Sequence, residues 1–264
     1  MALMSRDNVP TKIGKSFPMS TQNSLLSVSI IVPVLNEAER ISEALKELTS
    51  NFADCELIVV DGGSSDDTAL LSARWARVVS SSPGRAVQMN LGARSSSGQV
   101  LWFIHADCRI DPEALTQIRL ALTNPEIIGG GLSLRFDRGG PALRYLAWSS
   151  TKRARHLHQI FGDQAIFVRR DIFDTLGGFP EIAIMEDLEL SRCLNRQGRL
   201  IVLDAASTAS SRRFIKYGTW SMIAFMQLLK IYYFLGVPPE KIRRLYAAGP
   251  LWKRQRTPID RGGK

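Results

Sequence analysis

The sequence has few cysteines and no long hydrophobic run. Its three cysteines, Cys55, Cys108 and Cys193, include no CxxC pair. Such usage favours a reducing compartment and argues against a disulfide scaffold or a zinc ribbon. No stretch reaches the roughly 18 apolar residues that a membrane-spanning helix needs. Residues 1–27 also lack the apolar core of a secretory signal, so we expect a flexible leader there and a cytoplasmic protein.

Several common catalytic and nucleotide-binding motifs are missing as well. The chain contains no GxGxxG, no GxxxxGK[ST] and no GxSxG sequence. Their absence argues against dinucleotide binding of the Rossmann type, against P-loop NTP hydrolysis and against α/β-hydrolase chemistry.

The net charge of +9 is concentrated at the C-terminal end. From residue 212 onward the chain has 12 Lys or Arg residues but only two acidic ones, Glu240 and Asp260, so the remainder is nearly neutral. This basic part contains no recognisable nucleic-acid module, and its aromatic residues lie in an apolar segment rather than among the charges. We therefore expect no nucleic-acid partner.

That apolar segment, residues 220–235, allows two interpretations. It is too short to span a membrane, and Gln227 and Lys230 interrupt it. A buried core helix is one possibility. The other is an interfacial helix with Trp220 and two tyrosines at headgroup level and basic residues on anionic lipid, which would give peripheral membrane contact and access to a lipidic acceptor at the inner face of the membrane.

From residue 28 the chain alternates short apolar segments with longer amphipathic ones. We expect strands at 28–34, 56–60, 77–80, 100–104, 127–136, 165–168 and 200–203, and helices at 37–49 (capped by Asn36), 67–76, 85–94, from Pro112, at 185–196, 219–235 and 239–247. This alternation is typical of an α/β fold with a doubly wound, mostly parallel central sheet and helices on both faces. A C-terminal helical segment follows, and residues 149–161 read as a basic loop, either a lid or an ordinary solvated loop.

Acidic residues follow two of the expected strands, at the edge of the sheet where ligands bind in such folds. Asp61 ends the second strand, and Gly62 and Gly63 behind it would let backbone amides approach a ligand closely. The simpler alternative is that Asp61 and Ser65 only make turn and capping hydrogen bonds.

The second acidic strand end is His105-Ala106-Asp107. A carboxylate at the rim of the sheet can ligate a hard divalent cation, which usually keeps water and substrate phosphates as its other ligands. His105 would be a second ligand or a hydrogen-bonded structural residue.

Two helix starts carry further candidates. Gly84 and Arg85 open a helix whose free amides and guanidinium suit an anion, although a solvated helix start explains them too. Asp187 is either a favourable acid in the first turn of its helix or a general base toward a hydroxyl.

Taken in order, these motifs resemble family 2 glycosyltransferases of the GT-A fold. The matching segments are 29–37 (the opening strand), 59–66 (the nucleotide loop), 84–93 (the third helix), 105–107 (the position of Asp-x-Asp) and 177–180 followed by Glu186-Asp187 (the late acidic motif). With 162–164 and 211–214, the chain looks most like a bacterial subgroup named after neighbouring radical-SAM or selenoprotein genes.

The resemblance implies an inverting glycosyltransferase that uses a UDP- or GDP-sugar donor, Mg²⁺ or Mn²⁺, and a hydroxyl acceptor. It implies one GT-A domain at 28–250, with a nucleotide-binding half at 28–123, an acceptor half at 124–214, C-terminal helices at 219–247 and a basic tail at 251–264. The implied catalytic residues are Asp187 and Glu186, and Asp107 is the implied metal ligand. The implied donor-binding residues are Pro33, Asn36, Glu37, Asp61, Gly62, Gly63, Ser64, Asp66, Gly84, Arg85, Asn90, His105 and Ala106, and the acceptor-side residues are Gly162, Asp163, Gln164, Arg212 and Arg213.

One departure from the family pattern is that His105 replaces the first carboxylate of Asp-x-Asp. Two other functions stay open. A sugar-1-phosphate nucleotidyltransferase shares the sheet and the metal, but Asn36-Glu37-Ala38 stands where such an enzyme would carry a Gly-rich, Lys-containing loop. A non-catalytic nucleotide-sugar-binding protein is the other alternative.

Overall fold

The structure is a computed structural model that describes residues 26–250. Almost all of the expected leader and all of the expected basic tail lie outside the described residues.

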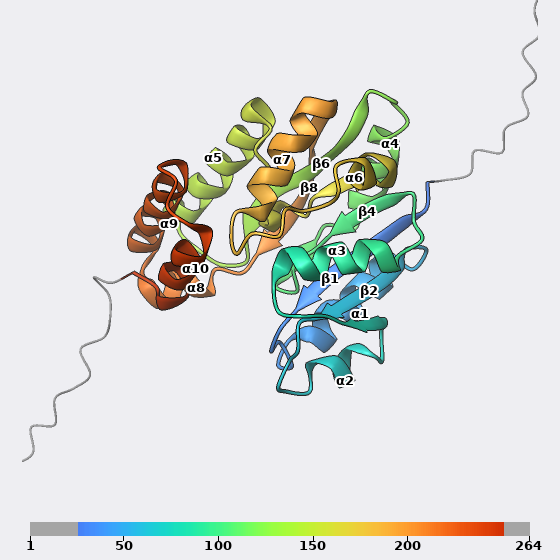
Figure 1. Cartoon of the computed structure of the whole chain (residues 1–264), viewed down its shortest axis with the longest axis horizontal. Helices are drawn as coiled ribbons and strands as arrows, with labels where there is room; N and C mark the ends of the chain where they lie inside the picture. The colour runs from blue at the N-terminus through green and yellow to red at the C-terminus, as the bar shows by residue number, and fades with distance from the viewer. Residues whose placement is uncertain (1–25, 251–264) are drawn as a thin grey trace, which may run out of the picture.

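The described residues form a mixed eight-stranded sheet in the order β3-β2-β1-β4-β7-β6-β8-β5 (Figure 1). The strands are β1 (Val28–Val34), β2 (Glu56–Asp61), β3 (Arg77–Ser80), β4 (Val100–Phe103), β5 (Cys108–Ile110), β6 (Ile127–Phe136), β7 (Phe167–Arg169) and β8 (Arg199–Ala209). Strands β1 to β4 pair in parallel, as do β6 and β8, whereas β7 and β5 run antiparallel to their neighbours. Four of the seven pairings are parallel, which confirms the expected sheet type.

Helices cover both faces of this sheet, also as expected. They are α1 (Ile41–Asn51), α2 (Thr68–Ser72), α3 (Arg85–Ser95), α4 (Ala114–Ala121), α5 (Pro141–Leu157), α6 (Arg170–Thr175), α7 (Glu186–Gln197), α8 (Arg212–Tyr217), α9 (Thr219–Phe234) and α10 (Pro239–Ala248), with a 3₁₀ turn at Gly162–Gln164. Because side chains alternate along a strand, Ile30 and Val32 pack with α1 on one face, while Ile31 packs with α3 on the other.

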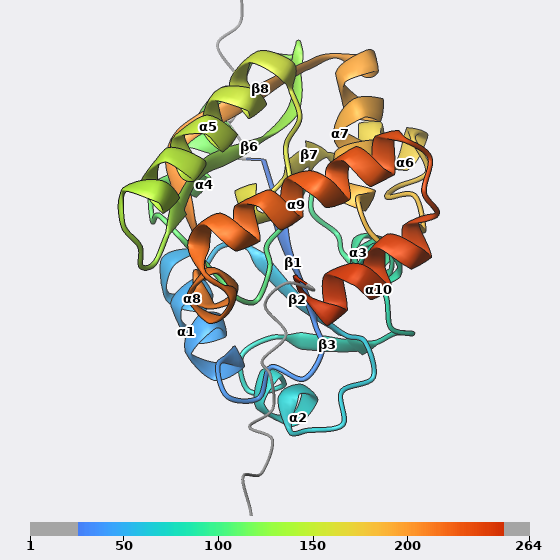
Figure 2. The same cartoon turned by 90° about the vertical axis from the view of Figure 1, so that its left-hand side faces the viewer.

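Helices α8, α9 and α10 form a third layer at one end of the molecule (Figures 1 and 2). They pack on α5 and on the turn before α7 through one apolar cluster, whose fully or nearly fully buried members include Ile242 of α10 and Met222 of α9. This packing holds the C-terminal helices against the main body. None of the helices within residues 26–250 is long and apolar enough to cross a membrane.

Several expectations about local structure are wrong. Residues 149–157 belong to α5 rather than to a loop. The buried side of α5 consists of Leu143, Ala147, Ser150 and Ala154, and its small and polar members hide the helical periodicity from a hydrophobicity pattern. Strand β5 was not expected because three residues are too few to show an alternation.

Helix α1 begins at Ile41, and Asn36 does not cap it. Asn36 adopts a left-handed backbone conformation with φ of 54°. Its side-chain oxygen accepts a hydrogen bond of 2.8 Å from the backbone amide of Ser65, so it joins two loops instead of starting a helix. Helices α2 and α4 are also shorter than expected, and Pro112 lies in the turn before α4.

Candidate functional site

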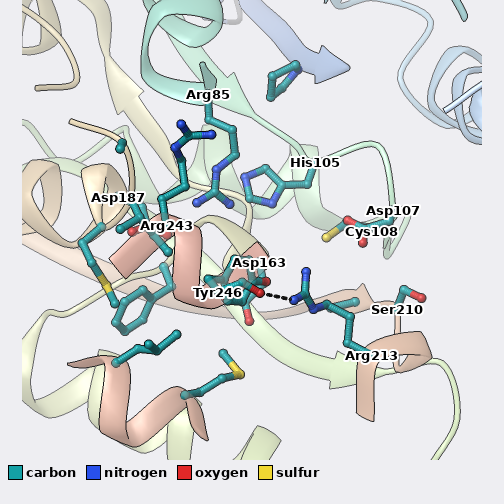
Figure 3. Close-up of a pocket in the computed structure, with 18 of the residues that line it drawn as sticks. Arg85, His105, Asp107, Cys108, Asp163, Asp187, Ser210, Arg213, Arg243 and Tyr246 are labelled. Carbon is teal, nitrogen blue, oxygen red and sulfur yellow. Dashed lines mark hydrogen bonds between the residues drawn. The ribbon is translucent and has the colours of Figure 1, made fainter. Parts of the chain in front are cut away.

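A cavity of about 1010 Å³ lies at the carboxyl ends of β1, β6 and β8, beneath the C-terminal helices (Figure 3). Val34, Phe136 and Ala209, at or next to the ends of these strands, line it together with residues from α3, α5, α9 and α10. The cavity therefore occupies the sheet edge at which open parallel sheets bind ligands.

Asp61, at the end of β2, is turned into its own loop. Its side chain accepts hydrogen bonds from the backbone amides of Gly63 at 3.2 Å and Ser64 at 3.0 Å, and from the Ser64 hydroxyl. Asp61 is 6% exposed and does not line the cavity. The contacts observed for Asp61 are thus hydrogen bonds within its own turn, as in the alternative in which Asp61 has only a local structural role.

The loops after β1 and β2 are locked to each other. Asp66 accepts hydrogen bonds from the backbone amides of Ala38 at 3.2 Å and Thr68 at 3.1 Å. Beneath them, Gln88 of α3 donates to the carbonyl groups of Val34 and Val60. A Cβ at Gly62 would come within 3.0 Å of the Gln88 side chain, so this glycine permits close packing of α3 on the sheet.

His105 and Gly162 are in close contact at the floor of the cavity. A Cβ on Gly162 would lie 2.6 Å from His105 Nε2, so only glycine leaves room for the imidazole. Burial, with the nearby Arg85 cation, lowers the pKa of His105. The imidazole therefore lies against the turn that carries Gly162 rather than standing free at the rim, and burial favours its neutral form.

Asp187 faces the cavity from the first turn of α7 (Figure 3). Its Oδ2 accepts a hydrogen bond of 2.8 Å from the Gly162 amide, and its Oδ1 accepts one of 2.7 Å from the Leu188 amide. Met185 just before the helix adopts φ of 71°, a conformation that costs a non-glycine residue about 1–3 kcal/mol. The turn thus holds the Asp187 carboxylate in one orientation, although the conformation of Met185 is unfavourable in free energy.

Glu186, the neighbour of Asp187, points to Arg85. Glu186 Oε1 lies 2.8 Å from Arg85 Nε, and the glutamate is 1% exposed. Burial raises the pKa of Glu186 to about 7, with Asp187 adding to the shift and Arg85 opposing it. Because Glu186 does not line the cavity, it acts on the site through Arg85.

Asp107 is paired with a cation. Arg212 of α8 lies 3.5 Å from Asp107 and 3.3 Å from Glu37, so it bridges the ends of two strands. Among residues 26–250, no three His, Cys, Asp or Glu side chains gather in a way that could hold a metal ion. Within the segment 105–107 the chain can offer a divalent ion one carboxylate, that of Asp107, which fits a metal whose remaining ligands are donor phosphates and water.

Asp163, Arg153 and Lys230 form a second charged group among the residues that line the cavity. Burial, with Asp187 nearby, raises the pKa of Asp163 to about 6. Burial, with Arg153 nearby, lowers the pKa of Lys230 to about 8. Both cations lie over the Phe161 ring, with Arg153 Cζ at 4.4 Å and Lys230 Nζ at 4.9 Å from its centre.

The structure gathers about half of the expected site residues in the cavity. Those that line it are Pro33, Glu37, Gly84, Arg85, His105, Ala106, Asp107, Asp163, Asp187, Arg212 and Arg213. Those that do not are Asn36, Asp61, Gly62, Gly63, Ser64, Asp66, Asn90, Gly162, Gln164 and Glu186.

Two of the residues outside the cavity hold the framework. Asn90 exchanges hydrogen bonds of 2.9 and 2.8 Å with the backbone of Phe179. Gln164 is fully buried and donates to the carbonyl of Leu132. Their polar side chains are thus satisfied by the protein itself.

Sequence reasoning missed the contribution of α10. Arg243 and Tyr246 of this helix line the cavity, and Arg213 holds the helix by a 2.7 Å hydrogen bond to the Tyr246 carbonyl (Figure 3). The only available signal was the surplus of basic residues after residue 212, which does not show which of them face inward.

Residues 29–174 match the model of the family Glycosyl transferase family 2, more than half of the chain. The chain belongs to glycosyl transferase family 2.

The relatives of this family 2 protein include a named glycosyltransferase and a named synthase. It is 28% identical over 174 residues to glycosyltransferase AglE of Haloferax volcanii, covering 60% of this chain and 57% of the relative. It is 32% identical over 102 residues to glucosyl-3-phosphoglycerate synthase of Mycolicibacterium smegmatis, covering 34% and 33%. The match therefore spans a little more than half the length of AglE and one third of the length of the synthase.

Solved structures show the same fold. The mannosyltransferase PcManGT of Pyrobaculum calidifontis, in complex with GDP-Man and Mn²⁺, superposes with a TM-score of 0.60 over 86% of this chain and 69% of that chain, at 20% identity. The expected GT-A architecture of this family 2 chain is confirmed.

Proposed function

We propose that this chain transfers a sugar from a nucleoside-diphosphate sugar to an acceptor hydroxyl, with inversion at the anomeric carbon. The observation that carries the proposal is the orientation of Asp187, whose carboxylate faces a large cavity that also contains Arg85 and Asp107. Family membership and relatives named as glycosyltransferases support the same reaction.

In the proposed reaction the acceptor oxygen forms a bond to the anomeric carbon while the bond from that carbon to the diphosphate oxygen breaks. The electron pair of the broken bond leaves with the diphosphate. Asp187 accepts the acceptor proton as the new bond forms, when the hydroxyl becomes acidic. Arg85, held in place by Glu186, stabilises negative charge on the leaving diphosphate.

Asp107 would provide the protein ligand of a Mg²⁺ or Mn²⁺ ion, and that ion would neutralise charge on the donor diphosphate. Glu37 and Arg212 would fix the Asp107 carboxylate. Asp61 and its loop would border the nucleoside of the donor. The reason is that the loops after β1 and β2 lie at the carboxyl ends of these strands, on the donor side of the proposed site.

Transfer assays with a panel of UDP- and GDP-sugars and Mn²⁺ or Mg²⁺ test the proposal. We expect turnover by the wild type and by Asp174→Ala, an exposed acid of α6 outside the cavity, and loss of turnover in Asp187→Ala and Asp107→Ala. Unchanged turnover in both site variants would overturn the assignment. Donor binding without turnover for any acceptor would point to a binding protein instead.

Within the family, we place this chain in the bacterial subgroup named after neighbouring radical-SAM or selenoprotein genes. The residues that support this are Gly162-Asp163-Gln164 and Ser211-Arg212-Arg213-Phe214, on which the resemblance rests.

We further propose a lipidic acceptor that the enzyme reaches from the cytoplasmic face of a membrane. Three apolar side chains of α9 that line the cavity support this proposal: Met222, Met226 and Leu229. On its outer side the same helix exposes Trp220 (69%) and Phe234 (58%), large apolar groups that suit a membrane surface.

Co-sedimentation with vesicles tests membrane contact. We expect binding to vesicles of phosphatidylglycerol that falls with salt, weaker binding to phosphatidylcholine, and a loss of binding in the double variant Trp220→Ser and Phe234→Ser. Leu70→Ser is the matched control, because Leu70 of α2 is as exposed (65%) but lies away from α9 (Figure 1). Equal binding to both vesicle types would contradict the proposal.

A further inference from the structure

Arg243 is a cation at the wall of the cavity that has no carboxylate partner in the part of the chain that the structure describes. It lines the cavity from α10, and in the view of Figure 3 its side chain extends toward that of Arg85. Within residues 26–250, no carboxylate pairs with Arg243, whereas Arg85 is paired with Glu186 and Arg212 with Glu37 and Asp107. Arg153, Arg213 and Lys230 also line the cavity without an ion pair, but each lies over an aromatic ring, whereas no such ring contact involves Arg243 among the described residues.

The position of Arg243 is determined by packing on both sides of it. Ile242, the preceding residue, is fully buried in the cluster that joins α8, α9 and α10. One turn further along the helix, the Tyr246 ring stacks on Arg213, with Arg213 Cζ 4.0 Å from the ring centre. Because α10 is fixed at these two points, Arg243 lines the cavity and the next residue, Arg244, does not, although both are exposed.

Positive charge at this end of the cavity would suit a bound diphosphate. Where many family members carry two carboxylates for a metal, this chain has His105 and a single carboxylate, Asp107, which already faces Arg212. A diphosphate is a strong multivalent anion, and arginine binds phosphate oxygens through paired N–H donors. Arg243 also lies beyond residues 29–174, so the family match assigns it no role.

We propose that Arg243, acting with Arg85, binds the diphosphate of the donor, and that α10 is therefore part of the donor site. This inference rests on the proposed transfer from a nucleoside-diphosphate sugar. The two guanidinium groups come from α3 and α10, so an anion bound between them would join the sheet to the C-terminal layer. The attraction comes from the protein, so it persists when divalent metal is removed.

Calorimetric titration of UDP, GDP and uridine tests the proposal in a buffer that contains EDTA. The proteins compared are the wild type, Arg243→Gln and the matched control Arg244→Gln, one residue along the same exposed helix. We expect Arg243→Gln to weaken binding of UDP or GDP by about tenfold or more, as for the loss of a charge-assisted hydrogen bond. Uridine affinity should stay unchanged, and Arg244→Gln should bind like the wild type.

Several results would overturn the proposal. Equal diphosphate affinity of Arg243→Gln and the wild type would show that Arg243 does not bind this group, and an increase only in the KM of the acceptor would place the arginine on the acceptor side. A parallel loss of uridine affinity would indicate a disturbed site, which thermal unfolding and an Arg243→Lys variant would detect. Failure of the wild type to bind UDP and GDP in EDTA would overturn this inference alone, whereas failure to bind them with Mn²⁺ added would overturn the proposed function as well.

Discussion

The backbone amide of Gly162 donates a 2.8 Å hydrogen bond to Oδ2 of Asp187, 25 residues further along the chain. The same glycine leaves space for the His105 imidazole. One residue without a side chain therefore sets the positions of two polar groups in the cavity, and it belongs to neither β-strand nor α-helix.

The first prediction concerns the charge of Asp187. Asp187→Asn keeps an oxygen that can accept the Gly162 hydrogen bond but removes the base. We expect kcat for transfer to fall by roughly 10²–10⁴-fold, the usual contribution of a general base, with little change in UDP affinity measured by calorimetry. A variant that retains kcat would show that another group takes the proton.

The second prediction concerns the space at Gly162. In Gly162→Ala the new methyl group would meet the His105 ring at 2.5 Å, so the turn must move away from Asp187. We expect a loss of about 1–3 kcal/mol in the free energy of unfolding and a lower kcat. Gly140→Ala is the control, because a Cβ there meets nothing within 4 Å; equal effects of the two changes in urea titrations would refute the argument.

The third prediction separates structure from donor binding at Asn90. Asn90→Ala leaves the buried amide and carbonyl of Phe179 without partners, which should lower the free energy of unfolding by about 1–3 kcal/mol. The UDP affinity of the folded variant should equal that of the wild type. A weaker UDP affinity in a variant of normal stability would instead support the donor-binding role expected from the sequence.

The fourth prediction concerns pH and Glu186. Its pKa is about 7 in the folded protein against 4.5 for the free group, so the folded state binds more protons than the unfolded state between these values. Stability contributed by Glu186 therefore falls as pH rises through this range. Between pH 6 and pH 7.5 we expect this loss to be about 1 kcal/mol.

Urea unfolding of the wild type and Glu186→Gln at pH 6 and pH 7.5 measures this component. The low pKa of His105 acts with opposite sign, but it is present in both proteins and cancels in the comparison. If the two proteins show the same pH dependence, the Glu186 carboxyl does not titrate in this range.

Much of the fold was predictable because the local pattern of apolar and β-branched residues indicates where strands and helices form. The β-branched runs of β1 and β2 and the apolar run of β4 mark buried parallel strands, and all three form as expected. Periodicity failed where burial involves small residues, as in α5 with Ala147, Ser150 and Ala154. It also failed where a partner from another part of the chain decides the conformation, as for Asn36 and Ser65.

For the site, the sequence by itself determined that Asp107 and Asp187 stand at a strand end and a helix start, because such positions depend only on local pattern. That Asp61 turns into its own loop was one of the alternatives its local sequence allowed, because its hydrogen bonds to Gly63 and Ser64 are local. Only the tertiary structure decided that Glu186 holds Arg85 and that α10 brings Arg243 to the cavity. The physical reason is that these arrangements depend on packing between distant segments. The burial of Ile242 positions Arg243, and the space left by Gly162 positions His105 and Asp187. Neither effect can be inferred from the charge or the periodicity of the sequence.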